Sequence, residues 1–372
     1  MKKNLCGILI MLLISGCSSN QSENVLKDSK TIVLGTDNRR KLKAPDALKI
    51  LNNTEIKFLD KNGNLLGSKN YHENYYKVKV DKNYYYLVSS EKIIKGSLTD
   101  QTEEAYNFDP QLNAIDSKIY LHEGDLYSID NQGFRPEPMN YLTTIYKNNE
   151  KQFDIIDDQA TSLVVVDQYI YVLTENNHNR KEPERGIVRN IYRYNTENQQ
   201  IDKMEHSIDS SHYSSTLITN AGKLYLYLYM ADNVPTPGNT ENLEDRLIVL
   251  DKNMEIESVS EYERFGPSFI SDIQNHIINN TLYIKSERHE LRAINLNTLE
   301  NKDVKLDEIS NAAQYHYWSQ HWYESDSERL VILGNYESNP YYSMYVYDLK
   351  TGHLIEEIKC PDVSALFVSS SN

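Results

Sequence analysis

Apolar and polar residues alternate in short runs along most of the chain, and many of these runs end in a polar residue followed by a turn. In YVYDLKTG, residues 345–352, the alternating run ends at Asp348 and a turn-like segment leads to Gly352. Alternation with a period of two predicts strands that bury one face, and turn residues between such strands predict hairpins. The pattern therefore predicts an all-β protein.

Seven segments share this pattern of a strand that ends in a polar residue and a turn. Their spacing averages about 48 residues, which is the size of one four-stranded propeller blade. An apolar run precedes most of them and a charged alternating run follows, so each is predicted to be the third strand of a blade, inside a charged outer strand. The seven segments are residues 56–64, 92–100, 126–133, 191–198, 247–253, 291–298 and 345–352.

The two ends of the chain predict how such a ring closes. The first blade has ALKILNN, residues 47–53, as its expected second strand but lacks a clear first strand, whereas SALFVSS, residues 364–370, is left over after the last blade. We predict a seven-bladed β-propeller of four-stranded blades, closed by this C-terminal strand so that no sheet edge stays open. Six blades with an irregular N-terminal cap are an alternative, because residues 92–100 match the repeat least well, and eight blades are another.

The DLKTG turn at residues 348–352 resembles the turns of bacterial propellers of the YVTN and quinoprotein-like type, where they join the third and fourth strands. The resemblance covers nearly the whole chain after the N-terminal segment. Quinoprotein repeats commonly place a Trp after this turn, but TGHLIEEI, residues 351–358, contains none. The resemblance therefore implies a fold and does not imply a cofactor.

The N-terminus has the pattern of an export signal. Lys2 and Lys3 precede an apolar stretch that is too short to cross a bilayer as a helix, which takes ~20 residues. The stretch ends in Ile14-Ser15-Gly16-Cys17, which resembles the lipobox of bacterial lipoproteins. This resemblance implies that Cys17 carries a diacylglyceryl anchor, while an ordinary signal peptide with a chance Cys is the alternative.

These features predict three parts of the chain. Residues 1–16 are expected to be a lipoprotein signal peptide, and residues 17–30 the lipidated Cys and a polar tether without apolar periodicity. Residues 31–372 are expected to form the propeller. We predict a monomer held by its acyl chains at the extracytoplasmic face of the cell membrane.

Composition narrows the expected partners. The formal net charge is −15, so nucleic acid and bare anionic lipid would be repelled and are not expected to bind. Once the signal is removed and Cys17 is acylated, Cys360 is the remaining cysteine, so no intramolecular disulfide is expected. The 29 Tyr residues favour strands.

The connections between second and third strands are predicted to emerge on one face of the ring. They are long at residues 174–190, 231–246 and 335–343 and short elsewhere. Loops on a rigid scaffold commonly carry binding residues, although long insertions are also tolerated without a function. The first of these loops is basic and is predicted to contact an anionic group through Arg180, Lys181, Arg185 and Arg189.

A second candidate binding feature is QYHYWSQHWYES, residues 314–325, which holds both Trp residues of the protein. Aromatic faces of this kind stack on sugar rings or cationic ligands, but the same residues also suit a tightly packed inner strand. Both interpretations are open for the four candidate ligand-binding residues, His316, Trp318, His321 and Trp322.

Enzyme signatures are mostly absent from the sequence. It has no zinc-binding His-Glu-x-x-His helix, no Gly-rich phosphate loop, no Gly-x-Ser-x-Gly elbow and no EF-hand loop. DKNGN, residues 60–64, resembles a calcium loop in composition but is better explained as a hairpin turn. The candidate ligands for a divalent cation in the central channel are Asp157, Asp158 and Asp272 together with His316, and the alternative for them is a role as strand-end or turn residues.

We therefore predict a binding or scaffold module for a protein, peptide or glycan at the cell envelope, without a cofactor. The alternative is an extracytoplasmic lyase or hydrolase with a divalent metal in the central channel. The sequence favours the binding module, because it supplies long loops and aromatic residues but no catalytic constellation.

Overall fold

The structure is a computed structural model. It describes residues 31–35, 54–107, 118–176, 188–206, 213–230, 244–265, 276–308, 320–360 and 367–370, apart from residues 61, 74, 76, 82, 90, 101, 137–138, 264, 286–289, 325–326 and 335–341 within these ranges. Among the residues described there is no helix long and apolar enough to span a lipid bilayer.

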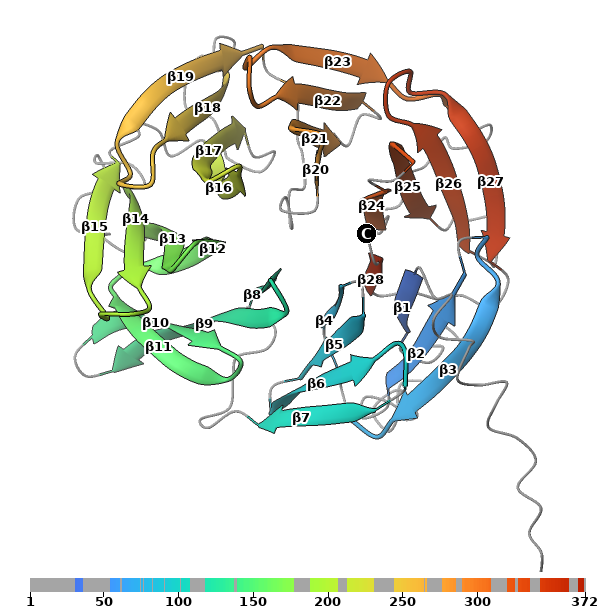
Figure 1. Ribbon diagram of the computed structural model, residues 1–372, viewed down its shortest axis with the longest axis horizontal. Helices are drawn as coiled ribbons and strands as arrows, with labels where there is room; N and C mark the ends of the chain where they lie inside the picture. Colours follow the sequence, from blue (N-terminus) through green and yellow to red (C-terminus); the bar gives the residue numbers. More distant parts are fainter. Residues whose placement is uncertain are drawn as a thin grey trace, which may run out of the picture.

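The protein is an all-β propeller. Its described strands form seven four-stranded antiparallel sheets that are arranged around a common centre (Figure 1). From the innermost strand outward, the first three sheets are β28 (Phe367–Ser370), β1 (Thr31–Gly35), β2 (Thr54–Leu59) and β3 (Leu65–Tyr71); β4 (Lys77–Val80), β5 (Tyr84–Val88), β6 (Lys92–Ser97) and β7 (Glu103–Asn107); and β8 (Lys118–His122), β9 (Asp125–Pro136), β10 (Met139–Lys147) and β11 (Glu150–Ile156).

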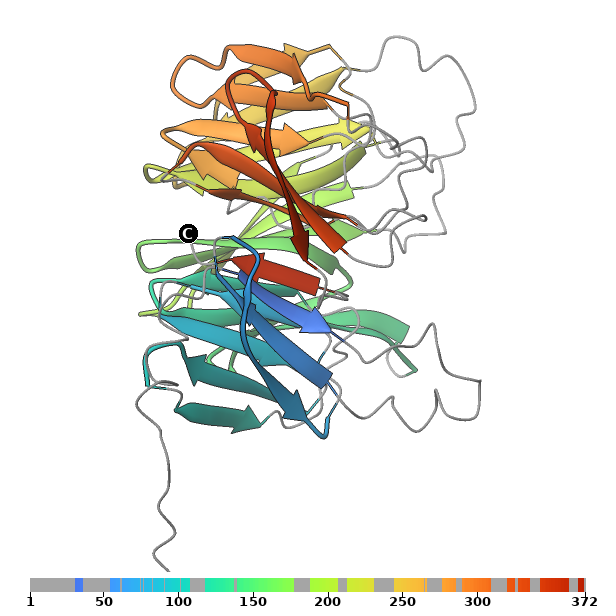
Figure 2. The ribbon, with the colours of Figure 1, turned by 90° about the vertical axis from the view of Figure 1, so that its right-hand side faces the viewer.

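The other four sheets follow the same order along the chain. They are β12 (Gln159–Val166), β13 (Tyr169–Asn176), β14 (Val188–Asn195) and β15 (Ile201–His206); β16 (Tyr213–Asn220), β17 (Lys223–Met230), β18 (Asp245–Leu250) and β19 (Ile256–Tyr262); β20 (Ile277–Ile278), β21 (Thr281–Lys285), β22 (Glu290–Asn295) and β23 (Asn301–Lys305); and β24 (Gln320–Glu324), β25 (Arg329–Gly334), β26 (Tyr342–Asp348) and β27 (Leu354–Cys360). Viewed from the side, the strands run across the thickness of the ring, so their ends define two faces (Figure 2).

Strands from both ends of the chain form the first sheet. β28 pairs with β1, with Leu34 opposite Phe367 and Thr31 opposite Ser370, and it also contacts β4 and β24 of the two neighbouring sheets. The C-terminal run therefore supplies the innermost strand of the first sheet, as predicted. The second strand of that sheet is β1. The prediction that residues 47–53 form this second strand was therefore wrong. Residues 47–53 lie outside the described residues.

The strand order of the third sheet also differs from the prediction. Residues 126–133 were expected to be the third strand, but they lie in β9, the second strand, and β8 takes the innermost place. The prediction took the polar residues at 130 and 131 as the end of a strand. Both are buried instead, and Asn131 donates a hydrogen bond to the Ala160 carbonyl and accepts one from Thr143. In the other six sheets the predicted third strands lie in the third position.

The polar residue that ends most third strands organises the turn into the fourth strand. The Oδ1 atom of Asp60 accepts hydrogen bonds from the backbone N–H groups of Asn62 and Asn64, both at 2.8 Å, and Gly63 has a φ of 74°. A side chain that bonds its own backbone in this way fixes a tight turn. DKNGN is therefore a hairpin turn, as predicted. The same capping is made by Asn195, Asp251, Asn295 and Asp348.

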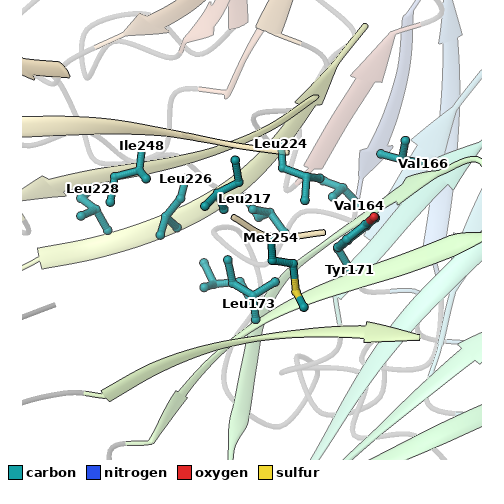
Figure 3. Close-up of a cluster of buried hydrophobic side chains, with 12 residues drawn as sticks. Val164, Val166, Tyr171, Leu173, Leu217, Leu224, Leu226, Leu228, Ile248 and Met254 are labelled. Carbon is teal, nitrogen blue, oxygen red and sulfur yellow. The ribbon is translucent and has the colours of Figure 1, made fainter. Parts of the chain in front are cut away.

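Several second strands, such as β17, are mainly apolar because both of their faces are buried between sheets. In β17 the residues Leu224, Leu226 and Leu228 face the fourth sheet, while the Tyr residues between them face the sixth. The leucine face meets Tyr171 and Leu173 of β13 in one cluster (Figure 3). Because successive side chains of a strand point to opposite faces, an alternating Leu-Tyr run builds two separate interfaces. The core of the protein is thus a series of contacts between neighbouring sheets.

A polar contact links the first two sheets near the outside of the ring. Glu103 of β7 accepts hydrogen bonds from the Lys69 ammonium at 2.8 Å and from the hydroxyls of Tyr71 and Tyr85. Burial acts to raise the pKa of Glu103, but these hydrogen bonds outweigh it, and the pKa is lowered. A lowered pKa in the folded state means that the contact stabilises the fold above the unfolded pKa of ~4.3 and is lost as the pH falls through the folded value.

Replacing Glu103 with Gln is therefore expected to lower the free energy of unfolding at pH 7 by about 1 kcal/mol and to reduce its dependence on pH between about 5 and 3. Urea unfolding at several pH values measures both effects. Glu197→Gln, at an exposed turn, is the matched control and should follow the parent protein. If Glu103→Gln kept the full acid dependence of the parent, this contact would not contribute to it.

Candidate functional site

Two of the predicted metal ligands, Asp157 and Asp158, lie between β11 and β12. Asp157 is exposed and has a φ of 69°, whereas Asp158 is only 2% exposed. The Oδ2 atom of Asp158 accepts hydrogen bonds from Thr174, Asn190 and Tyr192 at 3.1, 2.7 and 2.8 Å. These donors belong to β13 and β14, so the carboxylate ties strands of one sheet together. This geometry favours the strand-end role over a metal site; Asp272 lies outside the described residues.

Arg189, predicted to contact an anion from a basic loop, lies in β14 and is fully buried. Its Nε atom donates to Ser215 at 2.8 Å, and its guanidinium pairs with Glu175 at 3.2 Å. The third strand begins at Val188, so Arg189 lies within the sheet. Glu175 balances its charge inside the protein. Arg189 is therefore not part of a surface loop. The other three members of the predicted basic loop, Arg180, Lys181 and Arg185, lie outside the described residues.

The aromatic segment is described from Gln320 to Glu324, as strand β24, and His316 and Trp318 lie outside the described residues. Trp322 is buried and packs with Leu59, Val331 and Met344 at the contact with the first sheet. It thus agrees with the packed-strand interpretation. His321 lies one position away on the strand, so its side chain points to the opposite face.

His321 is part of a cluster of rings from two neighbouring sheets. The His276 ring, directly before β20, lies 5.5 Å from the His321 ring and 4.5 Å from the Tyr323 ring, measured between centroids. His321 and Tyr323 are two residues apart on β24 and meet edge to face at 5.8 Å. His276 is 7% exposed, and its Nδ1 atom makes no hydrogen bond within the described part of the chain. We call His276, His321 and Tyr323 the central cluster.

Lysines from two further strands influence the charge of this cluster. Burial lowers the pKa of His276 to about 3, with a further contribution from the positive charge of Lys79 on β4. Burial, His276 and Lys285 of β21 hold the pKa of His321 well below its ordinary value. Burial and the neighbouring Lys77 lower the pKa of Lys79 to about 7. Both imidazoles are therefore neutral at pH 7, in a surrounding that already carries positive charge.

The inner strands bring these residues together. β4 and β24 both contact β28, and β20 is the innermost strand of the sheet next to β24, so the cluster forms where several inner strands converge (Figure 1). A neutral imidazole offers one N–H donor and one acceptor, and an ammonium offers three donors. The arrangement can therefore bind a ligand that accepts hydrogen bonds. Among the residues that the structure covers, no group of three or more His, Cys, Asp or Glu side chains could hold a metal ion.

Sequence reasoning found His321 but missed His276 and Lys79. The only local signal for Lys79 is KVKV, residues 77–80, in which a Lys at every second position marks one face of a strand. His276 stands just before the INN turn of β20 and has no ligand spacing to His321. The two histidines meet only because inner strands of neighbouring sheets lie side by side.

No protein-family model matches the chain, and no curated protein matches it either. Solved structures do resemble its fold. AztD from Citrobacter koseri, in its apo form, is similar with a TM-score of 0.50 and 9% identity over 91% of this chain and 97% of that chain. A variant of apocarotenoid oxygenase from Synechocystis is similar with a TM-score of 0.51 and 8% identity over 93% of each chain. At these identities the likeness establishes the β-propeller fold alone.

Proposed function

We propose that this protein is a lipid-anchored binding or scaffold module at the extracytoplasmic face of the cell membrane, and that its seven sheets are the blades of one propeller. The proposed anchor is the diacylglyceryl group on Cys17, and the proposed partner is an envelope protein, peptide or glycan. The alternative, an enzyme with a divalent metal in the channel, gains little from Asp157 and Asp158, because the first is an exposed turn residue and the second is held by Thr174, Asn190 and Tyr192.

The observation that carries this proposal is the difference between the two faces of the ring. On one face the third and fourth strands are joined by short turns, most of which are capped by their own Asp or Asn side chains. On the other face the second and third strands are joined by longer segments in four sheets. These segments follow Gly35, Asn176, Met230 and Gly334. Long connections on one face of a rigid ring are a common setting for binding residues.

The position of β1 gives these faces an orientation relative to the proposed anchor. Thr31, the first residue of β1, pairs with Leu59 at the end of β2, so the N-terminal segment joins the ring at the face of the short turns. Gly35, at the other end of β1, pairs with Glu55 on the opposite face. The chain from the proposed anchor on Cys17 would therefore enter the ring on the short-turn face, and the long connections lie on the opposite face, where we propose that a partner binds.

A capture experiment tests the proposal. The chain from Ser18 onward is fixed to beads by its N-terminus and exposed to a detergent extract of its own envelope that includes cell-wall fragments. A loop variant has residues 177–187 and 231–243 replaced by short Gly-Ser turns, and a control variant carries Glu197→Ala, Lys252→Ala and Asn297→Ala at exposed turns of the opposite face. We expect a partner that the parent and control variant retain and that the loop variant loses at least tenfold.

Retained material is identified by mass spectrometry and glycan analysis, and a thermal transition confirms that each variant is folded. A partner lost only from the control variant would place binding on the short-turn face instead. Failure of the parent to retain any specific partner would contradict the proposed binding module.

A further inference from the structure

We infer that the central cluster and Lys79 form a binding site for a small anion that carries a phosphate or carboxylate group. The inference goes beyond the proposed partner at the long connections, since it concerns a different part of the ring. It starts from the placement of donors: His276 and His321 lie with ring centroids 5.5 Å apart, and Lys79 belongs to an inner strand of another sheet.

His276 gives the site its unused polar atom. The side chain is more than nine-tenths buried, and Nδ1 makes no hydrogen bond within the described part of the chain, although burying a polar atom without a partner costs free energy. Buried polar atoms of this kind are uncommon in folded proteins and call for an explanation. A ligand group that bonds the imidazole would remove this cost.

The sign of the surrounding charge indicates what kind of ligand fits. The protein as a whole is acidic, with a formal charge of −15, yet Lys79 acts on His276 and Lys285 acts on His321 as nearby positive charges. Lys77 adds a third positive charge next to Lys79. An anion would be attracted by the positive charge of these lysines and would accept hydrogen bonds from ammonium and imidazole N–H donors.

Two imidazoles are also common ligands of zinc, but the cluster suits a metal ion less well. The part of the chain that the structure describes supplies no third His, Cys, Asp or Glu to complete such a group. The neighbouring lysines would repel a divalent cation, and a zinc site takes at least three protein ligands. A metal ion is therefore the competing result of the experiment below.

Proton uptake should accompany binding. An anion favours the protonated forms of Lys79 and the two histidines, so its affinity is expected to rise as the pH falls. Among the described residues, the charged and titratable groups next to these side chains are Lys77 on β4, Lys285 and Tyr283 on β21, and Tyr323 on β24. Burial raises the pKa of both tyrosines, so they stay neutral between pH 6 and 8. Among the described groups, we therefore assign the change in affinity over this range to Lys79 and the histidines.

Calorimetric titration of the folded protein with inorganic phosphate and with succinate at pH 6 tests the site and separates the two ligand groups. Sulfate, whose charge does not change between pH 6 and 8, is titrated at both values. We expect one site per chain, at least tenfold weaker binding in Lys79→Gln and His276→Gln, recovery in Lys79→Arg, and at least threefold weaker sulfate binding at pH 8. Lys305→Gln and His353→Gln, at exposed positions, should bind as the parent does.

Thermal stabilisation of the unmodified protein by the same anions serves as a second measurement that does not depend on the variants folding. The inference is overturned if none of the three anions binds at pH 6, or if Lys79→Gln binds them as tightly as the parent. It is also overturned if the protein, freed of metal by a chelator, binds Zn²⁺ at one ion per chain and loses that ion in His276→Gln.

Discussion

Replacing Arg292 with Met is expected to lower the free energy of unfolding by about 3–5 kcal/mol, the largest effect we expect from any single substitution. Arg292 lies in β22, is 1% exposed, and pairs with Asp245 of the neighbouring sheet at 3.0 Å and with Asp303 at 2.7 Å. Its guanidinium also lies 4.6 Å from the ring centre of Phe265. The residue thus joins β22 to β18 through charge, hydrogen bonds and a cation–π contact.

The size of the effect comes from Asp245. This carboxylate is as deeply buried as Arg292 and also accepts a hydrogen bond from the Tyr227 hydroxyl at 3.0 Å. Without the guanidinium, the negative charge of Asp245 would lose its cationic partner while staying out of water. Removing one member of a buried ion pair is costly for this reason, even where the intact pair adds little net stability.

Urea unfolding of Arg292→Met measures this loss, and Lys223→Met provides the matched control. Lys223 pairs with Glu257 at 2.6 Å, but both side chains are at least 40% exposed, so its loss should have little effect on stability. The double variant Arg292→Met with Asp245→Asn should be more stable than Arg292→Met alone, because the buried negative charge of Asp245 is then removed as well. A loss below 1 kcal/mol in Arg292→Met would show that the pair is not a main link between these sheets.

Removing the C-terminal strand is expected to be the second large effect. A chain that ends at residue 366 lacks β28 and its four register pairs with β1, from Thr31 to Leu34. Each backbone hydrogen bond contributes about 0.5–1.5 kcal/mol, and the contacts of β28 with β4 and β24 are lost as well. We therefore expect a loss of about 3 kcal/mol or more, together with aggregation through the newly open edge of β1.

A chain that ends at Ser370 keeps the whole of β28 and is the control for this truncation. Thermal unfolding and light scattering compare the two chains. A synthetic peptide of residues 364–372 should raise the transition temperature of the shorter chain by refilling the strand position. Equal stability of the two chains would mean that β28 does not hold the first sheet to its neighbours.

Much of the fold could be predicted because its signals are local. The turns after the third strands depend on one Asp or Asn and the following few residues, so their sequence pattern identified six of the seven third strands. The failure at residues 126–133 has the same origin, since Asn131 looks like a turn residue. Only its partners Thr143 and Ala160, which come from other parts of the chain, allow it to be buried within a strand.

Less of the candidate site could be predicted, because its residues are placed by contacts between sheets. From the sequence, Arg189 was assigned to a basic loop. In the structure it is buried, where it forms an ion pair with Glu175 and a hydrogen bond to Ser215 from two other strands. From the sequence, Trp322 and His321 were assigned to one aromatic surface. Successive side chains of β24 point to opposite faces of the strand, so the two residues lie in different clusters. His276 could not be linked to His321 from spacing, since 44 residues separate them along the chain.

The sequence by itself determined the all-β character, the repeated unit of strands and turns, and the use of a C-terminal strand in the first sheet. These features could be predicted because period-two alternation and turn chemistry depend on only a few neighbouring residues. Only the tertiary structure decided that β1 is the second strand of that sheet, that Arg189 and Arg292 are buried and form ion pairs, and that His276 and His321 meet. These features depend on which strands lie next to one another. In a ring of sheets, that is set by packing between residues far apart in the chain.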